Sequence, residues 1–74
     1  MSDFGVVLFY TTSSAMRTEK LLKNAGLTIK LVPTPRQFSS DCGIALRFAW
    51  TDEPTVNSML RDEDIEYEAI HEVT

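Results

Sequence analysis

The order in which two hydrophobic periodicities follow one another is the feature that most restricts the fold of this chain. Four segments are apolar at alternate positions or throughout, which is typical of β-strands. They cover residues 4–10, 27–32, 44–50 and 65–73. Two further segments, at residues 14–25 and after Thr51, repeat apolar residues at helical spacing. The sequence therefore predicts the order strand, helix, strand, strand, helix, strand.

This order predicts an α+β fold, a ferredoxin-like βαββαβ sandwich over residues 1–74. Two helices would cover one face of a four-stranded antiparallel sheet. We expect the strand order 4-1-3-2, with right-handed crossovers that place the first and third strands in the middle, parallel to each other. The helix-free face should carry Val7 or Phe9 together with Ala45 and Ala49. A partly apolar face of this kind is a candidate docking surface, through which a homodimer could form.

Local signals mark the ends of the predicted helices. Residues 11–14, TTSS, supply N-cap candidates for the first helix, and Gly26 follows this helix where a left-handed residue is favoured. Thr51 is the predicted cap of the second helix. The glutamates of the last strand are expected to protect a sheet edge from stray pairing.

A chain of 74 residues buries only a small core, so it often depends on a disulfide, a metal ion or oligomerisation. The single cysteine excludes a disulfide within the chain. One cysteine and one histidine cannot supply the four ligands of a structural zinc site. We therefore expect no metal and no cofactor. Oligomerisation or an efficient fold remains as the source of stability.

Composition also restricts the partners and the compartment. The net charge of −4 and the missing RNP signature argue against nucleic-acid binding. We find neither a signal peptide nor an apolar run of membrane-spanning length, so we expect no membrane association. The free cysteine then predicts a reducing, cytoplasmic setting.

The only cysteine, Cys42, stands in the segment RQFSSDCGIALR, residues 36–47. Buried cysteines usually behave as small hydrophobes, whereas small polar residues and a glycine surround Cys42. These neighbours predict an exposed loop with a tight backbone. The alternative is an inert thiol packed under Phe38. Because Phe38 is an apolar residue in a polar loop, we expect it to anchor the loop on the core rather than contact a partner.

The chain resembles the selenium/sulfur carrier protein-like family, which consists of small bacterial and archaeal proteins. The most specific part of the resemblance is PRQFSSDCGIALR, with its SSxCG motif. The matching residues are Pro35, Arg36, Ser39, Ser40, Cys42, Gly43 and Arg47. The resemblance extends over nearly the whole chain through the segments KLLKNAG, IKLVPTPR and IEYEAIHEV. One segment, EPTVNSMLRDED, departs from the family pattern.

The resemblance implies that Cys42 holds sulfur or selenium as a persulfide or selenosulfide. The atom would come from a donor protein and pass to an acceptor protein. Such a carrier needs a thiolate and no resolving thiol nearby. We expect its thiolate or persulfide to be stabilised by Arg36, Ser39, Ser40, Gly43 and Arg47. Arg36 shares the loop and is the better candidate, since Arg47 lies five residues further along an extended run. Asp41 opposes the thiolate.

Two other functions stay open beside the carrier, which would hold a covalent intermediate without being a turnover enzyme. The first is a non-catalytic interaction or regulatory module, dimeric through the sheet face, in which Cys42 is incidental. The second is a peroxidase-like thiol enzyme, which needs a second thiol from a partner. We do not expect a catalytic dyad of Cys42 and His71. We place His71 at the same end of the sheet as Cys42, but about 10 Å away across two strand spacings.

Overall fold

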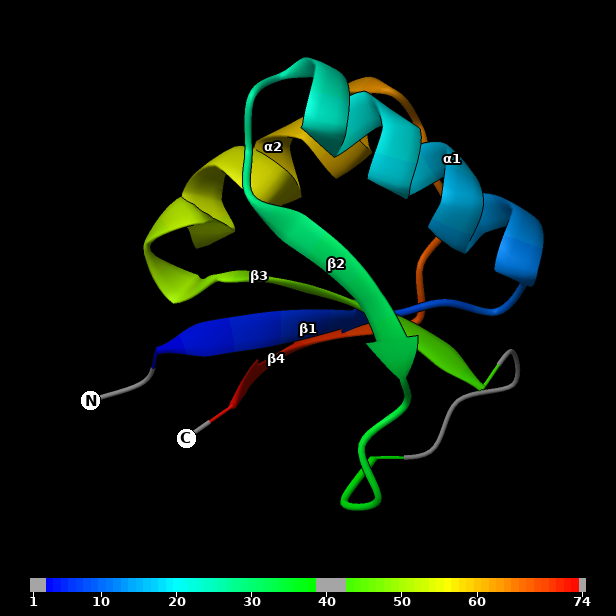
Figure 1. Ribbon diagram of the computed structural model, residues 1–74. Helices are drawn as coiled ribbons and strands as arrows, with labels where there is room; N and C mark the ends of the chain where they lie inside the picture. The colour runs from blue at the N-terminus through cyan, green and yellow to red at the C-terminus, as the bar shows by residue number, and fades with distance from the viewer. Residues whose placement is uncertain (1–2, 39–42, 74) are drawn as a thin grey trace.

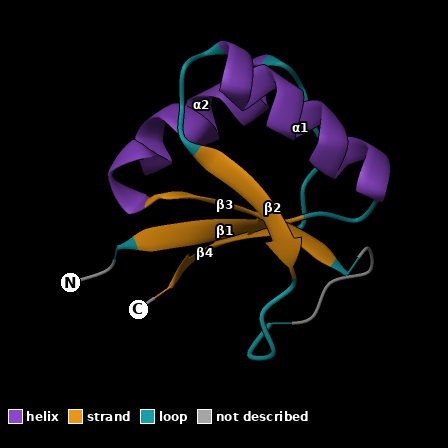
Figure 2. Cartoon of the chain, in the orientation of Figure 1, coloured by secondary structure: helices purple, strands orange, loops and turns teal. Residues whose placement is uncertain are grey.

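The computed structural model describes residues 3–38 and 43–73 and has the predicted order of elements. In chain order they are β1 (Phe4–Leu8), α1 (Thr12–Asn24), β2 (Ile29–Pro33), β3 (Ile44–Ala49), the 3₁₀ turn η1 (Trp50–Asp52), α2 (Glu53–Asp62) and β4 (Ala69–Val73). Both helices lie on one side of the sheet (Figure 1, Figure 2). The α+β fold of ferredoxin-like order is therefore confirmed.

The strands of the described residues form one sheet in the order β2-β3-β1-β4, and every neighbouring pair is antiparallel. The predicted strand order is confirmed, but the expectation that β1 and β3 run parallel is wrong. The crossover through α1 returns the chain so that β2 runs in the same direction as β1. The connection from β2 to β3 then reverses the chain, so β3 enters between them antiparallel to both.

Both helices end in the same way, although only one of them is followed by glycine. At the end of α1, Gly26 has a φ of 85°, and the N–H of Leu27 donates to the carbonyl of Leu22. At the end of α2, Asp64 has a φ of 54°, and the N–H of Ile65 donates to the carbonyl of Leu60. Each pattern is a Schellman motif, which satisfies carbonyls that the last helical turn leaves free.

The helix starts differ from each other. Thr11 caps α1, because its Oγ1 accepts a hydrogen bond of 3.2 Å from the N–H of Ser14. The predicted cap of the second helix is wrong, since Thr51 lies inside η1 and α2 begins at Glu53 without a side-chain cap. Pro54 in the first turn takes a position where a missing N–H costs nothing.

The main core lies between the sheet and the helices. Its sheet side consists of four side chains that are at most 2% exposed: Val7, Leu46 and Phe48 of the central strands, and Phe9, which follows β1. They pack with Ala15, Leu22, Val56, Leu60 and Ile65. The expectation that Val7 or Phe9 lies on the helix-free face is wrong. Strand residues alternate between faces, and it is Val6 and Leu8 that join Ala45 on the other side.

Candidate functional site

The helix-free face of the sheet is buried at its centre. Val6, Leu8 and Ala45 are at most 2% exposed although no helix covers them. In an antiparallel sheet with one covered face, the other face usually meets water. Here the first part of the β2–β3 connection passes on this side of the sheet (Figure 1). The docking surface that the sequence predicts is therefore partly occupied by the chain itself, and a homodimer through it stays a prediction.

Phe38 is the residue that ties this connection to the sheet. Its ring packs against the cluster of Val6, Leu8 and Ala45. It also stacks on His71 of β4, with ring centroids 4.3 Å apart and planes inclined by 10°. The prediction that Phe38 anchors the loop is confirmed.

Arg36 lies in a tight turn directly before this anchor. The N–H of Phe38 donates to the carbonyl of Pro35 at 3.0 Å, which closes a β-turn with Arg36 and Gln37 at its tip. Arg36 is exposed. The cation nearest in sequence to Cys42 on this side is thus carried by a turn of defined shape.

Gly43 defines the other end of the connection. Its carbonyl accepts a hydrogen bond of 3.1 Å from the N–H of Thr34, which extends the β2–β3 ladder by one pair. Its φ of 71° is a conformation that side chains other than those of glycine and a few polar residues rarely adopt. The expectation of an unusual backbone angle at Gly43 is confirmed.

Cys42 itself lies outside the described residues, as do Ser39, Ser40 and Asp41. The predicted exposure of the thiol and the roles of the two serines therefore stay predictions. Covalent geometry still places the Cα of Cys42 within 3.8 Å of that of Gly43. Gly43 lies directly before β3, which begins at Ile44.

Arg47 is not brought next to Gly43. It pairs with Val6 and Lys30 in the middle of the sheet, and its guanidinium carbon lies 5.1 Å from the ring centroid of Phe4. Phe4 pairs with Ala49, which lies further from Gly43 along β3. The side chain of Arg47 is thus directed away from Gly43, and its part in stabilising the sulfur stays a prediction.

His71 differs from its expected position. It lies in the middle of β4, paired with Val6. It is Ala69, at the start of β4, that pairs with Leu8 near the loop. The contact with Phe38 was missed in the sequence, because two rings more than thirty residues apart show no spacing that predicts a stack. The one available signal was the apolar character of Phe38 in a polar loop.

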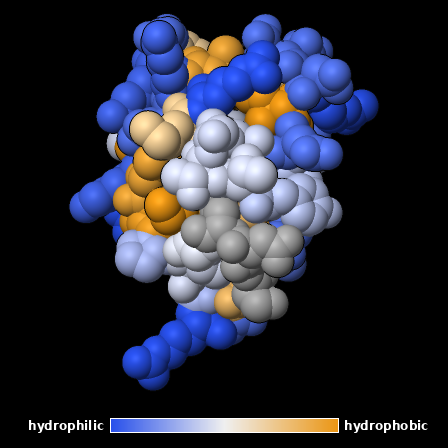
Figure 3. Space-filling model, turned by 90° about the vertical axis from the view of Figure 1, so that its right-hand side faces the viewer, coloured by the Kyte–Doolittle hydropathy of each residue, from blue (hydrophilic) through white to orange (hydrophobic). Residues whose placement is uncertain are grey.

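Hollows also lie outside the anchored turn. An apolar hollow of about 280 Å³ lies beside Gly43 and is lined by Leu31, Val32, Pro33, Gly43 and Ile44. Figure 3 shows apolar surface on its left. This is the side of the molecule that carries β2, which lies at the front in Figure 1. The residue after Cys42 therefore borders apolar surface.

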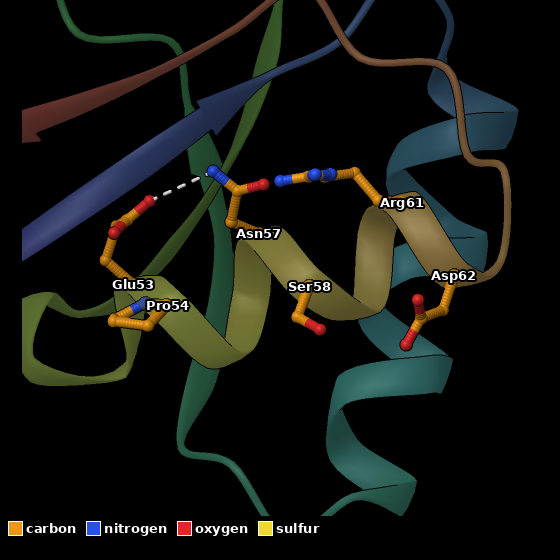
Figure 4. A pocket seen from close by; sticks show the side chains of 6 residues that line it. All are labelled: Glu53, Pro54, Asn57, Ser58, Arg61 and Asp62. Carbon is orange, nitrogen blue, oxygen red and sulfur yellow. Dashed lines mark hydrogen bonds between the residues drawn. The ribbon is translucent and has the colours of Figure 1, made fainter.

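The second hollow is polar and lies on the surface of α2 (Figure 4). Its volume is about 350 Å³, and it is lined by Glu53, Pro54, Asn57, Ser58, Arg61 and Asp62. The Nδ2 of Asn57 donates to Glu53 at 3.2 Å, while its Oδ1 is buried with no partner among the described residues. Because α2 covers the opposite face of the sheet from Phe38, this hollow is separate from the Cys42 loop.

Comparison with known families settles the membership of the chain. Residues 4–72 match the model of a family described as "Putative Se/S carrier protein-like". The chain belongs to this family. No curated protein and no solved structure matches the chain. Within residues 3–38 and 43–73, no helix is long and apolar enough to cross a membrane, and no cluster of three metal-ligating side chains occurs.

Proposed function

We propose that this member of the carrier family holds sulfur or selenium on Cys42, as a persulfide or selenosulfide, and passes the atom to a partner enzyme. The observation that carries the proposal is the family match over residues 4–72, a range that contains the only cysteine of the sequence. A covalently held sulfur or selenium atom needs a thiol, and Cys42 is the only thiol present. The single free cysteine also suits a reducing compartment, in keeping with the predicted cytoplasmic location.

The transfer consists of two exchanges that balance without an oxidant. In the first, the Cys42 thiolate attacks the terminal sulfur of a donor persulfide. A bond forms between Sγ and that sulfur, the sulfur–sulfur bond of the donor breaks, and the donor leaves as a thiolate. In the second, an acceptor thiolate attacks the same terminal sulfur and Cys42 leaves as a thiolate. A selenium atom moves in the same way from a donor that carries it on a thiol.

The surroundings of the loop support this chemistry in two ways. Arg36 provides an exposed cation in the turn before the cysteine, and a nearby cation favours the thiolate. Gly43 keeps the position after the cysteine free of a side chain, and a Cβ built there would have no heavy atom of the described residues within 4 Å, its chain neighbours aside. A partner protein therefore meets little steric obstruction at Gly43.

The proposal is tested by the intact mass of the protein, purified without reductant and then exposed to glutathione persulfide. We expect the gain of one sulfur atom, reversed by dithiothreitol and missing in Cys42→Ser. A second incubation with a thiol acceptor should return the original mass and leave the sulfur on the acceptor. A wild-type protein that gains no atom from the donor would refute the carrier function and favour a non-catalytic interaction module.

A further inference from the structure

A third hollow lies on the helix-free face of the sheet, at the end where β1 begins. Its volume is about 420 Å³, and it is lined by Phe4 of β1, Lys30 of β2 and Ala49 of β3. Side chains two positions apart on a strand share a face, so Phe4 lies on the face of Val6, as does its cross-strand partner Ala49. The β2–β3 connection leaves β2 at the opposite end of the sheet (Figure 1). The hollow is therefore separate from the part of this face that Phe38 covers.

Two cations lie side by side at this hollow. Lys30 and Arg47 both line it, and they are cross-strand partners, so their Cβ atoms lie about 5 Å apart. Both side chains are exposed, and within residues 3–38 and 43–73 neither forms an ion pair. Of the described residues that line the hollow, only Asp3 is acidic. Two positive charges are thus present at the hollow against one negative charge.

The guanidinium of Arg47 is held at the hollow by an aromatic ring. Its central carbon lies over the ring of Phe4, 5.1 Å from the centroid. Because Phe4 pairs with Ala49, two residues further along β3, the side chain of Arg47 extends along the sheet toward Ala49. A cation–π contact uses the charge of the guanidinium and none of its N–H donors. Phe4 therefore orients the donors of Arg47 in advance, which lowers the entropy cost of binding a ligand.

The pairing of Lys30 with Arg47 departs from what a stable sheet favours. Like charges at directly opposed positions destabilise a sheet, whereas opposite charges there stabilise it. Natural proteins depart from such local rules mainly at functional sites. An anion between the two cations removes their repulsion and gains the attraction of both. The pair at the hollow therefore indicates an anion-binding site.

Charge and shape together restrict the class of anion. Arginine binds phosphate oxygens through two parallel hydrogen bonds, and lysine binds phosphate as a point charge. A dianionic phosphate head also balances both cations. Ala49 and Phe4 offer apolar surface beside them, and the volume falls within the range of about 300–1,000 Å³ that is typical of small-molecule sites. The net charge of −4 disfavours a long polyanion.

We infer that this hollow binds a small organic phosphate monoester, with its phosphate head between Lys30 and Arg47 and its apolar part over Ala49, beside Phe4. Every residue of the site belongs to β1, β2, β3 or the positions directly before β1 and β2. The site thus goes beyond the proposed carrier function and does not depend on it. Its test needs no transfer of sulfur or selenium.

The test is a titration of the ¹⁵N-labelled protein with phenyl phosphate at neutral pH, followed by the amide signals in NMR spectra. We expect saturable shifts at Lys30, Arg47 and Ala49, with a dissociation constant of about 1 mM for a ligand of this size. Inorganic phosphate lacks the apolar part and should bind about fivefold or more weakly. Equal binding of the two ligands would overturn the assignment of an organic phosphate and leave a site for the phosphate group alone.

Substitutions decide whether the two cations form the site. Lys30→Gln and Arg47→Gln should each weaken the binding of phenyl phosphate by about fivefold or more, and Lys30→Arg should preserve it. Lys20→Gln on α1 and Arg61→Gln on α2 make the same charge changes at exposed positions elsewhere and should leave the affinity unchanged. The NMR spectra of the variants also show whether each is folded.

Three results would overturn the inference. The first is a wild-type protein without saturable shifts in phenyl phosphate. The second is an unchanged affinity in folded Lys30→Gln and Arg47→Gln, or an equal loss in the Lys20→Gln and Arg61→Gln controls. The third is tighter binding of a tetraglutamate peptide than of phenyl phosphate, which would assign the hollow to an acidic segment of a partner protein.

Discussion

Lys30 of β2 and Arg47 of β3 lie directly opposite each other on the helix-free face, as cross-strand partners. Both side chains are exposed, and neither forms an ion pair within the part of the chain that the structure describes. Like charges at directly opposed strand positions destabilise a sheet. The cation of Arg47 instead rests on the ring of Phe4. This pair is an unfavourable contact that the sheet tolerates.

The replacement Lys30→Glu should therefore stabilise the protein. It turns a repulsive cross-strand pair into an attractive one, worth roughly 0.2–1 kcal/mol in the free energy of unfolding at low salt. Urea denaturation measures the change, and most of the gain should disappear in 1 M salt because exposed charges are then screened. Lys20→Glu on α1 makes the same change in net charge at an exposed site and is the control. Equal effects of the two replacements would contradict the argument.

The matching ends of the two helices lead to a second prediction. Asp64 adopts the left-handed conformation that Gly26 adopts at the end of α1. Because this conformation is strained for residues with a Cβ, Asp64→Gly should stabilise the protein by about 0.5–1 kcal/mol, and Gly26→Ala should destabilise it by about 1 kcal/mol. Thermal melting of both variants checks the signs. A lower melting temperature for Asp64→Gly would show that the carboxylate contributes more than the strain costs.

Gly5 gives a third prediction, because it lies in close contact with an indole ring. A Cβ at Gly5 would lie 2.6 Å from Cε3 of Trp50 and 2.9 Å from the carbonyl oxygen of His71. Both distances are too short, so Gly5→Ala should cost about 1–3 kcal/mol through overpacking. The double variant with Trp50→Leu should be less destabilised than the sum of the single changes. Strict additivity in urea denaturation would mean that Trp50 is not the cause.

The sequence predicts most of the fold, and its errors have a common physical origin. The order of elements follows from periodicity, and the strand order follows from short, right-handed connections. The faces of β1 could not be assigned, because Phe4, Val6 and Leu8 are as apolar as Val7 and Phe9. Only packing against the helices decides between these two sets. Thr51 likewise resembles a cap, and the 3₁₀ turn that displaces it depends on tertiary contacts of Trp50.

The candidate site was predictable in composition and only partly in geometry. Cys42, Arg36 and Gly43 stand together in one short segment, so the sequence alone is enough to group them. The stack of Phe38 on His71 joins the connection after β2, one edge strand, to β4, the other edge strand. No local sequence pattern encodes such a contact. The direction of Arg47 is also a tertiary property, set by the ring of Phe4.

The two arginines of the motif should consequently differ in their effect on Cys42. Arg36 lies in the turn next to the loop, whereas Arg47 is directed toward Phe4 and away from Gly43. We expect Arg36→Gln to lower the rate of sulfur uptake from glutathione persulfide at neutral pH by about three- to tenfold, because it removes the cation that shares the loop with Cys42, and a nearby cation favours the thiolate. Arg47→Gln should change this rate less than twofold. Arg61→Gln on α2, which covers the opposite face, makes the same charge change and controls for net charge. A larger loss for Arg47→Gln than for Arg36→Gln would show that the loop brings Cys42 toward the middle of β3, and it would transfer the stabilising role to Arg47.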